Sequence, residues 1–197
     1  MARPRGRSAA TRGVFAIEDP ALLLPERIAL DTSLVVRALI ETQPLHEACS
    51  DFLERLVTSE VTLVSSELLE AELAEAAFGI ALAERWGADW RRHRRDGRAR
   101  RRGRRLLADV RSRYELLLAS ADHVAVPIAP IAEDASALMA DYGLASYDAV
   151  HAASAIAARA EAIATTDTGF ALLPASLLRV YTDRSRVAAC RALRPQR

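Results

Sequence analysis

Short apolar runs alternate along the chain with longer stretches in which apolar residues recur every three or four positions. The runs typical of buried strands are 27–30, 60–65, 123–129, 162–166 and 177–182. The stretches between them have helical spacing. Strands that alternate with helices favour a parallel sheet covered on both faces, and 197 residues suffice for one well-packed domain. The pattern therefore predicts an α/β fold: a three-layer α/β/α domain with a mainly parallel central sheet of about five strands.

The predicted domain spans residues 26–183 and carries one long insertion. Residues 80–121 form an Arg-rich insertion whose second half has one apolar helical stripe, so we expect a helical hairpin or a partly mobile arm. Residues 1–25 are interpreted as a basic N-terminal extension and residues 184–197 as a C-terminal tail. The extension holds four arginines that we expect to form a flexible basic tail: Arg3, Arg5, Arg7 and Arg12.

The composition excludes some chemistry and points to an anionic partner. All 27 basic residues are arginine, which excludes a lysine Schiff base and the lysine of a P-loop. The net charge of +1 hides an asymmetry, because residues 91–105 hold ten arginines and one aspartate. The remainder has 17 basic and 25 acidic residues. A basic arm on an acidic body predicts a negatively charged partner for the arm.

Three interpretations of the arginine run stay open. It can bind nucleic-acid phosphates, with Trp86 and Trp90 stacking on unpaired bases. It can be a solvated charged loop whose tryptophans cover the core. It can also contact the acidic body of a dimer partner. The candidate nucleic-acid-binding residues are Arg91, Arg92, Arg94, Arg95, Arg98, Arg101 and Arg102.

The cysteines and the hydropathy indicate a cytoplasmic protein without a membrane partner. Cys49 and Cys190 fit a reducing compartment, and we expect two small buried residues rather than a disulfide. No apolar run reaches the roughly 18 residues of a transmembrane helix.

Four acidic residues recur where strands end or the following helices begin. Asp31 and Asp167 directly follow predicted strands, Asp148 opens a helix, and Glu72 lies two turns into another. Because the carboxyl ends of parallel strands share one edge of a sheet, all four can reach the same rim. Taken singly, each could instead be a helix-terminal charge, a turn residue or a solvent-facing side chain.

Four converging carboxylates favour a hard cation. Two carboxylates about 4 Å apart repel by about 4 kcal/mol at an effective dielectric near 20. All-oxygen ligands suit Mg²⁺ or Mn²⁺ and argue against zinc. We therefore expect a metal-dependent enzyme acting on phosphodiesters, in which Ser33 or Thr166 orients a water or a ligand carboxylate.

Four motifs in chain order resemble the PIN-domain ribonucleases, and among them the VapC-like toxins of toxin–antitoxin pairs. The motifs are LDTSLVV at 30–36, SSELLEAEL at 65–73, LASYDAVHAASA at 144–155 and ATTDTGF at 164–170. The resemblance selects Glu72 over Glu70 and implies that Asp31, Glu72, Asp148 and Asp167 are both the catalytic and the metal-binding residues. We expect His151 to be a packed or capping residue that leads away from the rim.

The resemblance covers residues 27–182 and implies Mg²⁺- or Mn²⁺-dependent endonucleolytic cleavage of RNA, a homodimer and inhibition by a small VapB-like antitoxin. The N-terminal extension and the insertion make the chain longer than a compact toxin, so the resemblance supports the fold more strongly than the toxin role. Two alternatives remain: a PIN-like RNA-binding or scaffolding module without activity, and a PIN nuclease with a housekeeping or DNA-directed role.

Overall fold

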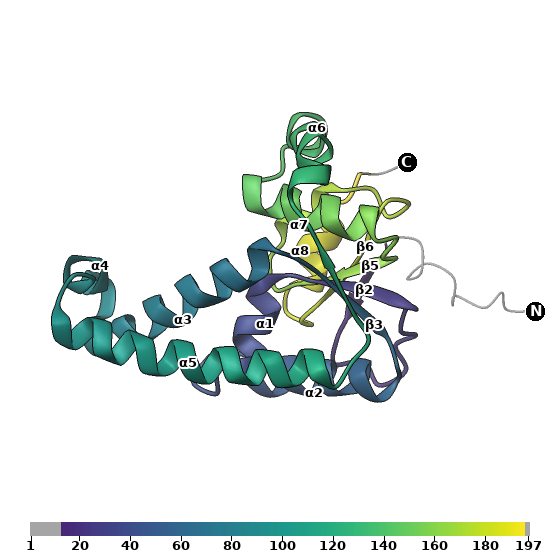
Figure 1. Ribbon diagram of the computed structural model, residues 1–197. Helices are drawn as coiled ribbons and strands as arrows, with labels where there is room; N and C mark the ends of the chain where they lie inside the picture. The colour runs from purple at the N-terminus through teal and green to yellow at the C-terminus, as the bar shows by residue number, and fades with distance from the viewer. Residues whose placement is uncertain (1–12, 196–197) are drawn as a thin grey trace, which may run out of the picture.

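A computed structural model describes residues 13–195 and contains one six-stranded sheet (Figure 1). All neighbouring strands are parallel, in the order β1-β6-β5-β2-β3-β4. The strands are β1 (Val14–Ala16), β2 (Arg27–Leu30), β3 (Thr62–Ser66), β4 (His123–Val126), β5 (Ala162–Ala164) and β6 (Arg179–Thr182). The predicted parallel sheet is thus confirmed, with one strand more than expected.

Helices cover both faces of this sheet, which confirms the three-layer α/β/α architecture. One face packs against the first four of the long helices and the other against the last three. The first set is α1 (Thr32–Leu39), α2 (His46–Thr58), α3 (Leu68–Trp86) and α5 (Gly97–Ala119). The second set is α6 (Ala132–Tyr142), α7 (Ser146–Ala157) and α8 (Val187–Leu193). Shorter helical turns are η2 (Gly87–Asp89), α4 (Trp90–His93), η3 (Ala129–Ile131) and η4 (Gly169–Leu172).

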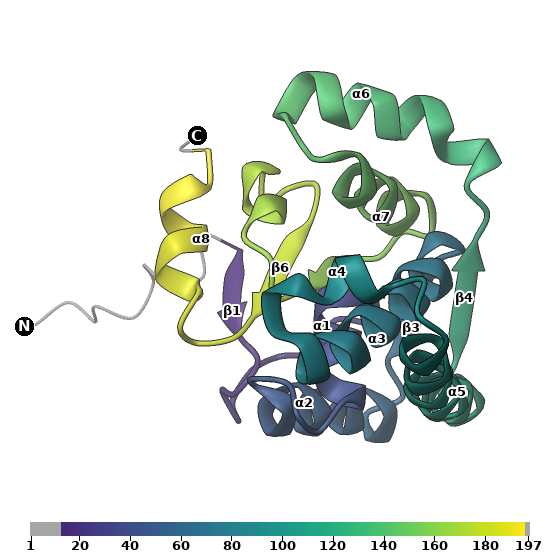
Figure 2. The ribbon, with the colours of Figure 1, turned by 90° about the vertical axis from the view of Figure 1, so that its left-hand side faces the viewer.

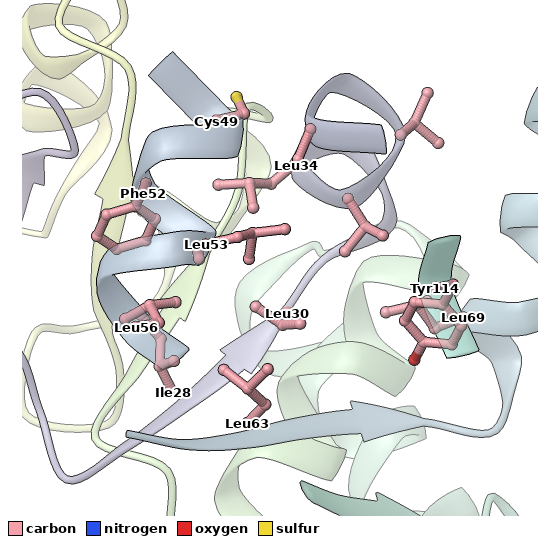
Figure 3. Packing of buried hydrophobic residues seen from close by; sticks show 14 of the residues in the cluster. Ile28, Leu30, Leu34, Cys49, Phe52, Leu53, Leu56, Leu63, Leu69 and Tyr114 are labelled. Atoms are coloured by element: carbon pink, nitrogen blue, oxygen red, sulfur yellow. The ribbon is translucent and has the colours of Figure 1, made fainter. Parts of the chain in front are cut away.

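The two hydrophobic cores follow from the alternation of side chains along each strand. On β2, Ile28 and Leu30 belong to the first core and Ala29 to the second, because successive strand residues point to opposite faces. Figure 3 shows Ile28, Leu30 and Leu63 of the sheet beneath apolar side chains of α1 and α2. Both faces of each central strand are therefore apolar, which explains the unbroken apolar runs in the sequence.

Two segments that the sequence places outside the domain belong to it. β1 lies within the predicted extension 1–25 and adds an edge strand beside β6. α8 lies within the predicted tail 184–197, and its fully buried Cys190 joins the second core. Three strand residues are too few to show a period, so β1 carried no signal. The arginines at 3, 5, 7 and 12 lie outside the described residues.

The insertion is a helical hairpin that projects from the sheet. α3 continues from the domain into the predicted insertion as far as Trp86, and α5 returns beside it, with α4 at the tip (Figures 1 and 2). The two helices pack closely at Gly103, where a Cβ atom would lie 2.3 Å from Cδ2 of Phe78. None of the described helices is both long and apolar enough to cross a membrane.

Candidate active site

The four acidic residues come from four different elements at the carboxyl edge of the sheet. Asp31 follows β2 and caps α1, and Asp167 follows the neighbouring strand β5. Asp148 lies in the first turn of α7, and Glu72 lies in the second turn of α3. Strand order thus brings together residues that the chain separates widely.

Asp31 is buried, with 5% of its surface exposed, and is held by one of its two oxygens. Its Oδ2 accepts hydrogen bonds from the Ser33 backbone at 3.3 Å, the Ser33 hydroxyl and the Thr165 hydroxyl at 2.7 Å. Its Oδ1 lies 4.0 Å from Nε2 of His151 and has no hydrogen-bond donor among the described residues. One oxygen fixes the carboxylate, and the other stays available to a ligand.

Glu72 is held in the same way from the opposite side of the site. Its Oε2 accepts hydrogen bonds from Thr32 Oγ1 at 2.6 Å and from His151 Nε2 at 2.6 Å. In the neutral ring, Nδ1 of His151 then accepts from the Ser66 hydroxyl at 3.1 Å. Glu72 Oε1 has no hydrogen-bond partner in the described part of the chain.

His151 is buried, as expected, but the prediction that it leads away from the rim was wrong. It lies on the same side of α7 as Asp148, because helical residues three apart share a face. That spacing was visible in the sequence. What the sequence did not show is that α7 packs against α3 and β3, which brings the ring to Glu72 and Ser66.

Asp148 and Asp167 meet at Gly169. A Cβ atom on this glycine would lie 2.9 Å from Asp148 Oδ2 and 3.4 Å from Asp167 Oδ1. The Gly169 backbone N–H donates to Asp167 Oδ1 at 2.8 Å. Within residues 13–195, neither oxygen of Asp148 has a hydrogen-bond donor. Only a residue without a side chain leaves room for both carboxylates here.

The pKa values reflect this crowding. Burial, and after it the charges of Asp167 and Asp31, raise the pKa of Asp148 to about 6. Burial also raises the pKa of Asp31, against the opposing effects of His151, Ser33 and Thr165. Burial acts in the same sense on Glu72, but hydrogen bonds from His151 and Thr32 outweigh it and lower the pKa of that carboxyl. The site therefore carries unbalanced negative charge.

The hydroxyl side chains that contact the acids differ in part from the predicted pair, Ser33 and Thr166. Ser33 does bind a site carboxylate, Asp31. The neighbouring threonine in this role is Thr165, whose Oγ1 also accepts the Asp167 backbone N–H at 2.8 Å. Thr166 instead accepts from Arg37 Nε at 2.9 Å and makes no side-chain contact with an acid of the site. Both threonines directly follow β5, and Thr165 is the one that lies against Ser33 and Asp31 at the start of α1.

The four carboxylates have the right chemistry for a hard divalent ion. Each keeps at least one oxygen without a hydrogen-bond donor among the described residues, and all the ligand atoms are oxygen. The described residues nevertheless contain no group of three or more acidic, histidine or cysteine side chains already arranged to hold a metal. A single ion bound by three of them would require the carboxylates to move closer together.

The seven predicted nucleic-acid-binding arginines are all exposed and lie at the far end of the hairpin. Three of them form ion pairs: Arg92 with Asp89, Arg94 with Glu75, and Arg102 with Glu84.

The two tryptophans are packed against other side chains and do not stand free for base stacking. Trp86 stacks on His93, with the ring centroids 5.0 Å apart, and Trp90 packs against Gly79. The interpretation in which these two indoles cover a small core agrees with this packing.

Comparison with protein families identifies the family of the chain. The family model described as "PIN domain" matches residues 28–175, about three quarters of the chain. The chain belongs to the PIN domain family, which the sequence motifs had indicated. This membership indicates a nuclease of the PIN superfamily, whose members generally depend on a divalent metal. No curated protein matches the chain significantly.

Proposed function

We propose that the chain is a Mg²⁺- or Mn²⁺-dependent endoribonuclease. One observation carries the proposal: four carboxylates from four elements meet at one rim, and the pKa of Asp148 is raised to about 6 by burial and by its acidic neighbours. A structural role would pair these acids with arginines. Here the protein supplies only hydroxyls, backbone N–H groups and one imidazole, so the negative charge is left for a cation.

The residues around the acids keep them in place for binding. Thr165 and Ser33 fix Asp31, and Thr165 also holds the backbone of Asp167. Thr32 and His151 fix Glu72. Asp31, Glu72, Asp148 and Asp167 would hold the metal, which when bound activates water and neutralises charge on the phosphodiester. Asp148 is the carboxyl with the least hydrogen-bond support from the protein.

Substitution of Asp31 tests this activity. Purified wild type should cleave RNA in Mn²⁺ or Mg²⁺ and be inactive in EDTA. Asp31→Asn keeps the shape and the contacts of Oδ2 but removes the charge, and we expect its cleavage rate to fall by at least about 100-fold. Asp51→Asn, on the exposed side of α2, is the matched control and should cleave like wild type. RNA binding without cleavage by the wild type would instead support a binding module.

The toxin role is the finer part of the proposal, and the four motifs support it. Expression of the wild type should arrest growth, Asp31→Asn should not, and a small VapB-like protein should relieve the arrest. In solution we expect a homodimer, with twice the 21.5 kDa mass of one chain. Cleavage of RNA without growth arrest would favour a non-toxin PIN nuclease, and a preference for DNA would contradict the RNA substrate.

A further inference from the structure

The short helix α4 lies on the face of α3 that carries Glu72. Glu72 and Gly79 are seven residues apart, which is two turns of helix and about 10 Å along its axis. Trp90 of α4 packs on Gly79, where a Cβ atom would lie 3.3 Å from Cη2 of the indole. Figures 1 and 2 both show α4 and α7 on the same side of α3. α4 therefore lies farther out along the hairpin than the acidic site, over the same face of α3.

Contacts at both ends of α4 fix its position. Before it, Trp86 stacks on His93 at an interplanar angle of 20°. After it, Arg94 forms two hydrogen bonds of 2.5 Å with the carboxylate of Glu75, one turn from Glu72. Asp96 then caps α5 by accepting from the Arg98 backbone N–H at 2.7 Å. These contacts hold α4 in a fixed position, so its side chains project from a defined surface.

This surface carries cations that the described residues leave largely uncompensated. Arg91 and Arg95 are exposed and form no ion pair within residues 13–195. Arg92 contacts Asp89 only at 3.4 Å, with 83% of its side chain exposed. The Arg91 guanidinium rests over the Trp90 ring, 4.7 Å from its centroid. These three arginines form a positive surface at the tip of the hairpin, on the side of α3 that carries the negative site.

Three arginines of α5 lie on another side of the hairpin. Arg98, Arg101 and Arg105 line a groove of the hairpin together with Ala81 and Glu84 of α3. Ala81 lies nine residues after Glu72, which corresponds to about 180° around the helix. Arg98, Arg101 and Arg105 therefore flank the side of α3 that faces away from the acidic site.

We propose that Arg91 and Arg92 of α4, with Arg95 in the turn after it, bind backbone phosphates of the RNA strand whose scissile phosphodiester lies at the four acids. The inference rests on the proposed function and adds where the rest of the substrate is held. Three cations farther out along the hairpin, on the side of α3 that carries Glu72, would offset the repulsion between the polyanion and the acidic rim. Contacts to phosphates alone position a strand without reading its sequence. Arg98, Arg101 and Arg105 take no part in this contact.

Two matched triple variants test the proposal. Arg91→Gln/Arg92→Gln/Arg95→Gln and Arg98→Gln/Arg101→Gln/Arg105→Gln remove the same charge from exposed positions on different sides of the hairpin. Binding of a fluorescent single-stranded RNA is measured by anisotropy in EDTA as a function of salt, and cleavage is measured separately in Mn²⁺. The α4 variant should bind about tenfold more weakly or worse, with a log–log salt slope shallower by about 2. The α5 variant should bind within about twofold of wild type.

A third variant tests whether the position of the arginines matters when their charge is unchanged. Trp90→Ala keeps every arginine but removes the contact that seats α4 on Gly79, so RNA affinity should also fall. Equal losses in both triple variants, or no loss in the α4 variant, would overturn the proposal. The binding assay does not depend on cleavage. If the wild type does not cleave RNA but its RNA affinity still depends on the α4 arginines, the nuclease proposal is refuted and this inference stands. If the wild type cleaves RNA and its RNA affinity does not depend on the α4 arginines, this inference is refuted and the nuclease proposal stands.

Discussion

Nε2 of His151 lies 2.6 Å from Oε2 of Glu72, so one hydrogen bond ties α7 to α3 at the acidic site. The same ring reaches Ser66 at the end of β3 through its other nitrogen. His151 thus links a candidate metal ligand to the sheet, and Thr32 completes the support from α1. Four elements that enclose the site are joined by a few polar side chains.

Loss of the His151 imidazole should weaken metal binding more than it destabilises the fold. His151→Ala removes the donor that positions Glu72, and the loss of such an outer partner typically costs about 10- to 100-fold in metal affinity or activity. Mn²⁺ titration by calorimetry and the cleavage rate measure the effect. His123→Ala is the matched control, because His123 also bonds a β3 serine, Ser65, but lies outside the site. Equal effects in the two variants would contradict a special role for His151.

The raised pKa of Asp148 predicts that the metal-free protein loses stability as pH rises. The ordinary pKa of the carboxyl is 3.8, and burial with the charges of Asp167 and Asp31 raises it to about 6 in the folded protein. Between pH 3.8 and about pH 6 the folded state binds more protons at this group than the unfolded state does. Over this range Asp148 therefore destabilises the fold increasingly as pH rises. Asp148→Asn should therefore raise the melting temperature in EDTA at pH 7 and change it little at acidic pH.

Thermal melts at both pH values, with and without Mn²⁺, check this prediction. Added metal should stabilise the wild type at neutral pH more than it stabilises Asp148→Asn, because the cation relieves the repulsion that the substitution has already removed. A variant less stable than wild type in EDTA at pH 7 would contradict the assignment of Asp148 to a repulsive cluster.

A methyl group at Gly169 should reduce cleavage without unfolding the protein. Its Cβ would lie 2.9 Å from Asp148 Oδ2, so the carboxylate must move. A displacement of about 1 Å at a reacting centre can cost about 100-fold in rate. We expect a cleavage rate for Gly169→Ala at least about tenfold below wild type. Gly97→Ala, at the start of α5, meets only the end of the Arg101 side chain, 3.8 Å away, and serves as control. Full activity in Gly169→Ala would show that the two acids are not used in this arrangement.

Thr165 joins Asp31 to the backbone of Asp167, so its hydroxyl should matter for both stability and activity. Thr165→Val has nearly the same shape but leaves the buried carboxylate and the N–H without this partner, at a cost of about 1–3 kcal/mol. Chemical denaturation measures the cost. Thr165→Ser keeps the hydroxyl and should restore most of the stability and of the cleavage rate. A valine variant as stable as wild type would mean that water replaces the hydroxyl.

The sequence by itself determined the layers and the general position of the acids. Alternation of apolar runs with helical stretches requires a parallel sheet between helices, and the carboxyl ends of parallel strands share an edge. Asp31, Asp148 and Asp167 could therefore be assigned to one rim before any coordinates. Glu72 needed more than periodicity, and the motif resemblance selected it over Glu70.

Tertiary packing alone decided what supports those acids. Thr165 rather than Thr166 faces the site because the segment after β5 packs against the start of α1, and His151 reaches Glu72 because α7 packs against α3 and β3. The position of α4 depends on the contact of Trp90 with Gly79, eleven residues earlier. Local spacing specifies the face of an element. Which other element covers that face depends on contacts between segments far apart in the chain, and a single sequence does not display them.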